Sequence, residues 1–222
     1  MGEAKRRKSS EPNYGLIPKG VVSADLIQVN SSNEKFLYLT QVDWADAWIR
    51  GGEVPISLAS SYLSGTRSGI FTPDENTIHR SPVDLRSLRP AFHLENVRNI
   101  SIVNSSINGV PIPNIINADY YVEDGLILSF CNDFSAEIAR RMGKRACVKI
   151  LNIADLKANL DHQIGLNGTM ANCGYTHDHQ RNHFLKSVND AWQKEYRLFW
   201  SGNERRTVTI PPNTAALVAT FQ

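Results

Sequence analysis

Hydrophobic and polar positions along this chain follow two different periods, which predict both strands and helices. Runs that alternate in polarity or are rich in β-branched and aromatic residues predict strands, at 36–40, 54–58, 99–103, 106–112, 126–130, 146–151, 196–200, 206–210 and 217–221. Helical spacing predicts helices at 43–50, 133–142 and 153–160. Mixed elements, with strands crowded near the C-terminus, favour an α+β fold over a regular βαβ repeat.

Turn residues refine this picture. The segment 43–50 places Trp44, Ala47 and Trp48 on one helical face, and glycines follow it directly, as at a helix end. The segment 60–82 is rich in Ser, Gly, Thr and Pro, and we expect a long loop there. We expect a hairpin of 99–103 with 106–112 around Asn104-Ser105, with Asn108-Gly109 as a second turn signal.

The first twenty residues differ from the rest of the chain. They are polar and contain four consecutive cations, from Lys5 to Lys8. Such a run can contact phosphates, but a solvated terminal tail is the commoner structure. From Val21 the pattern is globular without an interrupting linker, so we expect a flexible basic tail over 1–20 and one domain over 21–222.

Composition narrows the class of protein. Hydrophobic residues make up 41% and charged residues 21%, which are globular values, and the net charge of +2 alone does not indicate a nucleic-acid partner. No apolar run of about eighteen residues exists, and the N-terminus lacks the apolar core of a signal peptide. The three cysteines form no CxxC pair. We therefore expect no membrane segment and a cytoplasmic protein with reduced thiols.

Two kinds of catalytic chemistry receive weak support from the residues. His177, His179 and His183 lie close together with Asp178, a density that could serve a metal-dependent hydrolase. Their spacing matches no HExxH site and no fourth ligand is evident, so a polar loop at a substrate cleft is the preferred interpretation and no metal is predicted. Cys131 follows a strand, but free cysteines usually behave as buried apolar residues.

The segment 186–197 carries the densest signal. If 196–200 is a strand, alternation places Glu195 and Arg197 on one face with Phe199, while Tyr196 and Trp200 lie on the other. One interpretation is a surface ion pair at a sheet edge. The alternative is a carboxylate that holds a substrate hydroxyl or stabilises a developing positive charge.

Four stretches of this sequence resemble a known family. FLKSVNDAWQKEYRLFW (184–200) is similar to the Lys-x(n)-Trp-x-x-Glu-x-Arg ending of a widespread bacterial family of unknown function. Members of that family are similar to ADP-ribosyltransferases, including toxins that ADP-ribosylate DNA. The family's opening strand, helix and glycine turn resemble FLYLTQVDWADAWIRGGEVPIS (36–57). Its second strand and the following loop resemble ISLASSYLSG (56–65), and its central strand resembles GLILSFCND (125–133). The resemblance spans roughly 36–221.

This resemblance implies an ADP-ribosyltransferase-like fold, in which two small packed β-sheets with flanking helices hold NAD⁺ as cosubstrate in the cleft between them. Glu195 matches the late glutamate that contacts the nicotinamide ribose and stabilises the oxocarbenium-like charge. The implied cofactor-binding residues lie on the opening strand, in the following loop, on the central strand and beside the glutamate: Tyr38, Thr40, Tyr62, Arg67, Ser129 and Arg197.

The function implied is an NAD-dependent ADP-ribosyltransferase of a macromolecule, acting as a toxin or a phage-defence effector. The basic tail favours a DNA or RNA acceptor over protein, and an antitoxin protein is an expected partner. One departure supports an alternative: active members carry Arg or His on the first strand, where this chain has Tyr38, Leu39 and Thr40. The alternative is a catalytically inactive nucleotide- or protein-binding module of the same fold.

Overall fold

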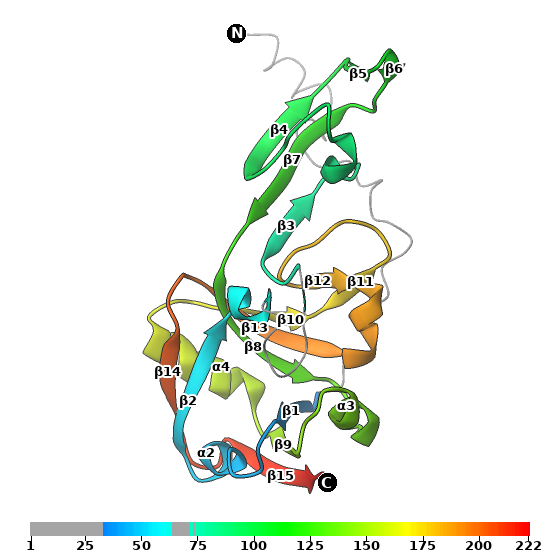
Figure 1. Ribbon diagram of the computed structural model, residues 1–222. Coiled ribbons are helices and arrows are strands. Elements are labelled where there is room, and N and C mark those ends of the chain that lie inside the picture. The colour runs from blue at the N-terminus through cyan, green and yellow to red at the C-terminus, as the bar shows by residue number, and fades with distance from the viewer. Residues whose placement is uncertain (1–32, 64–71, 73) are drawn as a thin grey trace, which may run out of the picture.

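Figure 1 shows the computed structural model of the protein, which describes residues 33–63, 72 and 74–222. The predicted tail over 1–20, the start of the globular pattern at Val21 and the candidate residue Arg67 lie outside the described residues. The described part is α+β and consists mostly of strands in several antiparallel sheets, with few helices. No helix in this part is long and apolar enough to cross a membrane.

The largest sheet contains eight strands. Six of them lie in the order β10 (Thr169–Asn172), β13 (Glu195–Ser201), β8 (Gly125–Cys131), β1 (Lys35–Leu39), β9 (Ala146–Ile150) and β15 (Ala215–Thr220). Two further strands, β2 (Gly52–Leu58) and β14 (Arg206–Ile210), pair with each other, and the end of β2 pairs with the start of β8. Because β1 pairs with the other end of β8, the sheet divides into two branches on one side of this strand.

The main core lies against one face of the eight-stranded sheet. Leu198 and Trp200, which share one face of β13 as the period-2 pattern predicts, belong to this core. The helices α2 (Ala45–Ile49) and α4 (Ile153–Ile164) cover it with their apolar faces. Helix α4 runs one turn beyond the predicted end and stops at Gly165, whose φ of 78° is the left-handed conformation of a glycine C-cap.

A second, smaller core lies on the opposite face of β1. Phe36 and Tyr38 point into it and pack under α3 (Ala136–Arg141). The Ser135 side chain caps this helix by accepting a hydrogen bond from the backbone of Ile138. Gly143, with a φ of 62°, ends the helical segment, as the sequence predicts.

A three-stranded sheet projects away from the main sheet (Figure 1). It consists of β3 (Thr77–Arg80), β7 (Ile115–Val122) and β4 (Val97–Ile102), and carries the short hairpin β5 (Ser106–Ile107) and β6 (Val110–Pro111). We call these strands, together with the 3₁₀ helix η2 (Leu85–Leu88), the arm. The arm has its own apolar core, centred on Leu85, Leu88, Ile115 and Ala118.

The arm corrects two predictions. The predicted loop over 60–82 contains strand β3 and begins within the 3₁₀ helix η1 (Ala59–Leu63). The predicted hairpin around Asn104-Ser105 is wrong, because β4 pairs with β7 and the hairpin turns at Asn108-Gly109. Both residues of that turn have positive φ, 50° and 78°, which an Asn-Gly pair adopts more readily than Asn-Ser.

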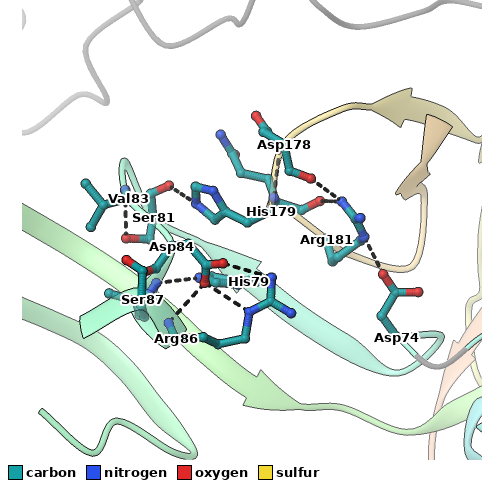
Figure 2. A network of polar contacts seen from close by, with 12 residues as sticks. Asp74, His79, Ser81, Val83, Asp84, Arg86, Ser87, Asp178, His179 and Arg181 are labelled. Atoms are coloured by element: carbon teal, nitrogen blue, oxygen red, sulfur yellow. Dashed lines mark hydrogen bonds and ion pairs between the residues drawn. The ribbon is translucent and has the colours of Figure 1, made fainter. Parts of the chain in front are cut away.

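Loop 177–184 packs against the start of the arm (Figure 2). It follows β11 (Gly174–Thr176) and precedes β12 (Leu185–Ser187), which pair in parallel. The backbones of His79 and Arg181 exchange two hydrogen bonds, and the Arg181 side chain pairs with Asp74. This joint fixes the start of the arm next to the strand that leads, through the 3₁₀ helix η3 (Val188–Gln193), into β13.

Candidate functional site

Glu195 and Arg197 point to the same side of β13, as the alternation predicts. Both are almost completely buried, with side-chain exposures of 5% and 2%. Strand β13 lies between β10 and β8 and is no edge strand. The interpretation of this pair as a surface ion pair at a sheet edge is therefore wrong.

The Glu195 carboxylate accepts hydrogen bonds from two cationic side chains. Its Oε1 accepts hydrogen bonds from Nε and Nη2 of Arg197 at 2.9 and 2.7 Å, and its Oε2 accepts one from Nζ of Lys186 at 2.8 Å. Ser129, the cross-strand neighbour of Arg197 on β8, also contributes to lowering the pKa of Glu195. The three hydrogen bonds from the charged groups of Arg197 and Lys186 hold the carboxylate in one orientation.

Charge fixes the protonation state of this group. Burial alone raises the pKa of Glu195, but the positive charges of Arg197 and Lys186 outweigh burial and hold the pKa well below its usual range. Burial likewise lowers the pKa of Lys186, yet Glu195 and Glu75 together raise it above its ordinary value. Glu195 is therefore a carboxylate and Lys186 an ammonium group at neutral pH.

A second carboxylate completes the cluster. Glu75 forms an ion pair with Arg197 and lies 3.7 Å from the Lys186 ammonium group. Two buried cations thus face two buried carboxylates, which is how a protein interior tolerates charge. The Lys186 ammonium group also donates a hydrogen bond to Oε1 of Gln193 at 3.2 Å. We call Glu75, Lys186, Glu195 and Arg197 the charge cluster.

A cavity of about 180 Å³ opens beside the charge cluster. Five of the residues predicted for the site line it: Tyr38, Tyr62, Ser129, Glu195 and Arg197. Five further polar lining residues were not predicted as site residues: Thr72, Glu75, Lys144, Lys186 and Gln193. The structure thus gathers side chains from β1, η1, β8 and β13 around one space.

Thr40, which was also predicted for the site, is not among the residues that line this cavity. It directly follows β1, and its hydroxyl accepts a hydrogen bond from the lining residue Lys144 at 2.9 Å. The Tyr38 hydroxyl accepts a hydrogen bond from the backbone N–H of Ser135 at 2.7 Å. The ring of Tyr38, rather than its hydroxyl, is therefore its contribution to the cavity wall. Arg67 lies outside the described residues.

The histidines do not converge on one point. His177 is exposed, the His179 ring is hydrogen-bonded to the Ser81 carbonyl at 3.0 Å (Figure 2), and His183 is 3.0 Å from a Glu123 oxygen. Within the described residues no group of three or more His, Cys, Asp or Glu side chains is placed to hold a metal ion. His183 serves the site differently: its carbonyl accepts from Nη1 of Arg197 at 2.6 Å.

Cys131 is the cross-strand neighbour of Glu195 and lines the cavity. Burial raises the pKa of its thiol, and the Glu195 carboxylate raises it further. A nucleophilic cysteine needs the opposite environment, one that favours the thiolate. Cys131 is therefore a packing residue of the cavity wall.

No family model matches this chain, and no curated protein or solved structure is similar enough to be matched to it. The function is therefore inferred from the geometry of the site together with the resemblance of its motifs.

Proposed function

We propose that this protein is an NAD⁺-consuming ADP-ribosyltransferase with an ADP-ribosyltransferase-like fold, and that Glu195 is its catalytic carboxylate. The observation that carries the proposal is the buried, oriented and ionised Glu195 at the wall of a cavity that also contains Tyr38, Tyr62 and Ser129. The resemblance of the surrounding motifs to the family supports the same assignment.

In the proposed reaction the bond between the nicotinamide nitrogen and C1′ of the ribose breaks, and its electron pair leaves with nicotinamide. A nucleophilic atom of the acceptor then bonds to C1′ and loses its proton to solvent. Positive charge develops on the ribose as nicotinamide departs. A carboxylate already fixed beside that charge lowers the barrier, because no reorganisation is needed during the reaction.

The neighbours of Glu195 determine how a substrate would reach it. Three of its hydrogen bonds come from the charged groups of Arg197 and Lys186, while Ser129 is a neutral hydroxyl on the cavity wall. A ribose hydroxyl that enters the cavity would approach Glu195 from the side of Ser129, because displacing Arg197 or Lys186 would separate buried charges.

The size of the cavity agrees with one end of the dinucleotide. A cavity of roughly 150 Å³ accommodates a benzene ring, so about 180 Å³ suffices for a ring of the size of nicotinamide. The apolar wall formed by Phe36, the Tyr38 ring and Leu128 suits such a ring. The rest of the dinucleotide would lie along the open rim.

The proposed acceptor is a macromolecule, with DNA or RNA favoured over protein, and the proposed role is that of a toxin or a phage-defence effector with an antitoxin protein as partner. The cations from Lys5 to Lys8 support a nucleic-acid acceptor through phosphate contacts. Cys131, Cys147 and Cys173 are free thiols, which agrees with the cytoplasm as the proposed compartment.

An NAD⁺ consumption assay tests this function. Purified protein, labelled NAD⁺ and separate DNA, RNA and protein fractions should give nicotinamide and a labelled acceptor. Glu195→Gln should abolish the labelling, whereas the matched variant Glu204→Gln, at an exposed ion pair with Arg206, should retain it. Equal labelling by wild type and Glu195→Gln would refute the assignment.

One observation favours the alternative, a catalytically inactive nucleotide- or protein-binding module. β1 reads KFLYL and carries neither Arg nor His, and its Lys35 ammonium group lies 4.6 Å over the Tyr196 ring. Calorimetry that shows nucleotide binding without nicotinamide release would favour this module, and binding with turnover would exclude it.

A further inference from the structure

The two carboxylates of the charge cluster differ in the donors that they meet. Glu195 accepts three hydrogen bonds from Arg197 and Lys186. Glu75 forms its ion pair with Arg197 through Oε1, whereas its Oε2 lies 3.7 Å from the Lys186 nitrogen, which is too far for a hydrogen bond. No residue in the described part of the chain forms a hydrogen bond with this oxygen. Oε2 of Glu75 therefore keeps its capacity to accept.

Burial makes this oxygen unusual. The Glu75 side chain is only 3% exposed, and it lines the cavity beside the charge cluster. Buried polar atoms in proteins nearly always have a hydrogen-bond partner, so a buried carboxylate oxygen without a donor needs an explanation. A ligand in the cavity can supply the donor that the protein does not.

The local fold fixes the position of Glu75. The preceding residue, Asp74, pairs with Arg181 of loop 177–184 (Figure 2). The carbonyl of the following residue, Asn76, accepts the N–H of Glu123 at 2.9 Å. The chain is thus held on both sides of Glu75, immediately before β3, and the position of the carboxylate is part of the fold.

Glu75 also lies close to the catalytic carboxylate of the proposed reaction, because Glu75 and Glu195 contact the same nitrogen of Arg197, Nη2. When the ribose lies at Glu195, the attached nicotinamide ring occupies the cavity, and the carboxamide group on that ring comes within reach of Glu75. A carboxamide NH₂ has two N–H donors, whereas an ionised carboxylate can only accept. The two groups are complementary.

We propose that Glu75 is a specificity residue, whose Oε2 accepts a hydrogen bond from the carboxamide of the nicotinamide end of NAD⁺. The inference rests on the proposed function, since it assumes that the ribose lies at Glu195. The same carboxylate disfavours a dinucleotide that carries a carboxylate in place of the carboxamide, because two negative charges then meet without a donor between them.

Two dinucleotides that differ only in this group test the proposal: NAD⁺ and nicotinic acid adenine dinucleotide. Both are titrated calorimetrically into wild type and Glu75→Gln. Wild type should bind NAD⁺ at least about tenfold more tightly, as expected for one hydrogen bond to a charged group. In Glu75→Gln this preference should fall by about tenfold, because the glutamine amide is uncharged and can donate to the acid.

The preference is a ratio of two affinities, so a partial loss of folded protein changes both affinities alike and leaves the ratio intact. Glu75→Asp is a second variant that keeps the charge of the cluster but withdraws the carboxylate by one methylene group, and it should lower the preference as well. The matched control is Glu137→Gln, at an exposed ion pair with Arg140 outside the cavity lining; it should retain the preference.

Equal affinity of wild type for the two dinucleotides, or tighter binding of the acid, would overturn the proposal. A preference that both Glu75 variants retain would overturn it too, since equal weakening of both ligands would make Glu75 a structural residue. In either case, NAD⁺ binding by wild type would leave the proposed function standing. A wild-type protein that binds neither dinucleotide would overturn the proposed function itself, and the role of Glu75 with it.

Discussion

Removal of Arg197 should be the most damaging single change in the charge cluster. Its guanidinium group is 2% exposed and contacts three acceptors: the Glu195 carboxylate, the Glu75 carboxylate and the His183 carbonyl. Arg197→Met keeps much of the side-chain volume but leaves two carboxylates with Lys186 as the remaining cation of the cluster. Breaking a buried ion pair from one side typically costs about 3–5 kcal/mol, and we expect a loss of unfolding free energy in that range.

A double-mutant cycle identifies the cause of this loss. In Arg197→Met with Glu75→Gln, the cluster again has one cation and one carboxylate, Lys186 and Glu195. The double variant should therefore be less destabilised than the sum of the single variants, with a coupling of about 1–3 kcal/mol. A loss of packing alone would give additive effects.

Urea denaturation at neutral pH, followed by far-UV circular dichroism, measures these free energies. Arg206→Met is the matched control, since Arg206 and its partner Glu204 are 52% and 71% exposed; its effect should stay within about 0.5 kcal/mol. A cost below about 1 kcal/mol for Arg197→Met, or strict additivity in the cycle, would refute the account of the charge cluster.

Three further predictions concern other parts of the molecule. Burial and the neighbouring His179 lower the pKa of His79 from 6.5 to about 4. Because the unfolded chain binds the proton first, the free energy of unfolding should fall by about 3 kcal/mol as the pH drops from 6.5 to 4. Urea titrations should show a weaker pH dependence of this free energy for His79→Gln than for wild type. A methyl group at Gly168 would lie 2.3 Å from Nε1 of Trp200, whereas one at Gly202 meets nothing within 4 Å; Gly168→Ala should cost about 1–3 kcal/mol in a thermal melt, and an equal effect of both variants would contradict this packing. The three cysteines are buried, so a thiol reagent should label them only after denaturation, and rapid labelling of the native protein would show that they are accessible.

Local patterns predicted much of the main sheet. Alternation placed Glu195 with Arg197 and separated them from Trp200, because the two faces of a strand have different environments. Glycines after helices predicted where α2 and the segment of α3 end, since the left-handed conformation is accessible to them. These predictions needed only neighbouring residues.

Contacts between distant segments could not be predicted in this way. Glu75 lies in a polar stretch typical of a turn, and nothing in its neighbours indicates that it is buried against Arg197. Lys144 reads as one of several cations after a helix, and its approach to Thr40 depends on the pairing of β1 with β9. Strand β7 was missed, and so β4 was assigned the wrong partner.

The central claim is that Glu195 acts on bound NAD⁺, and the release of nicotinamide by wild type and by Glu195→Gln tests it most directly. Both proteins should bind NAD⁺ in calorimetry, because Gln keeps the shape of the cavity wall. Removal of a preorganised electrostatic group typically costs about 10²–10³ in kcat, so release by the variant should fall at least that far. An unchanged rate of nicotinamide release in Glu195→Gln, with NAD⁺ bound, would contradict the account.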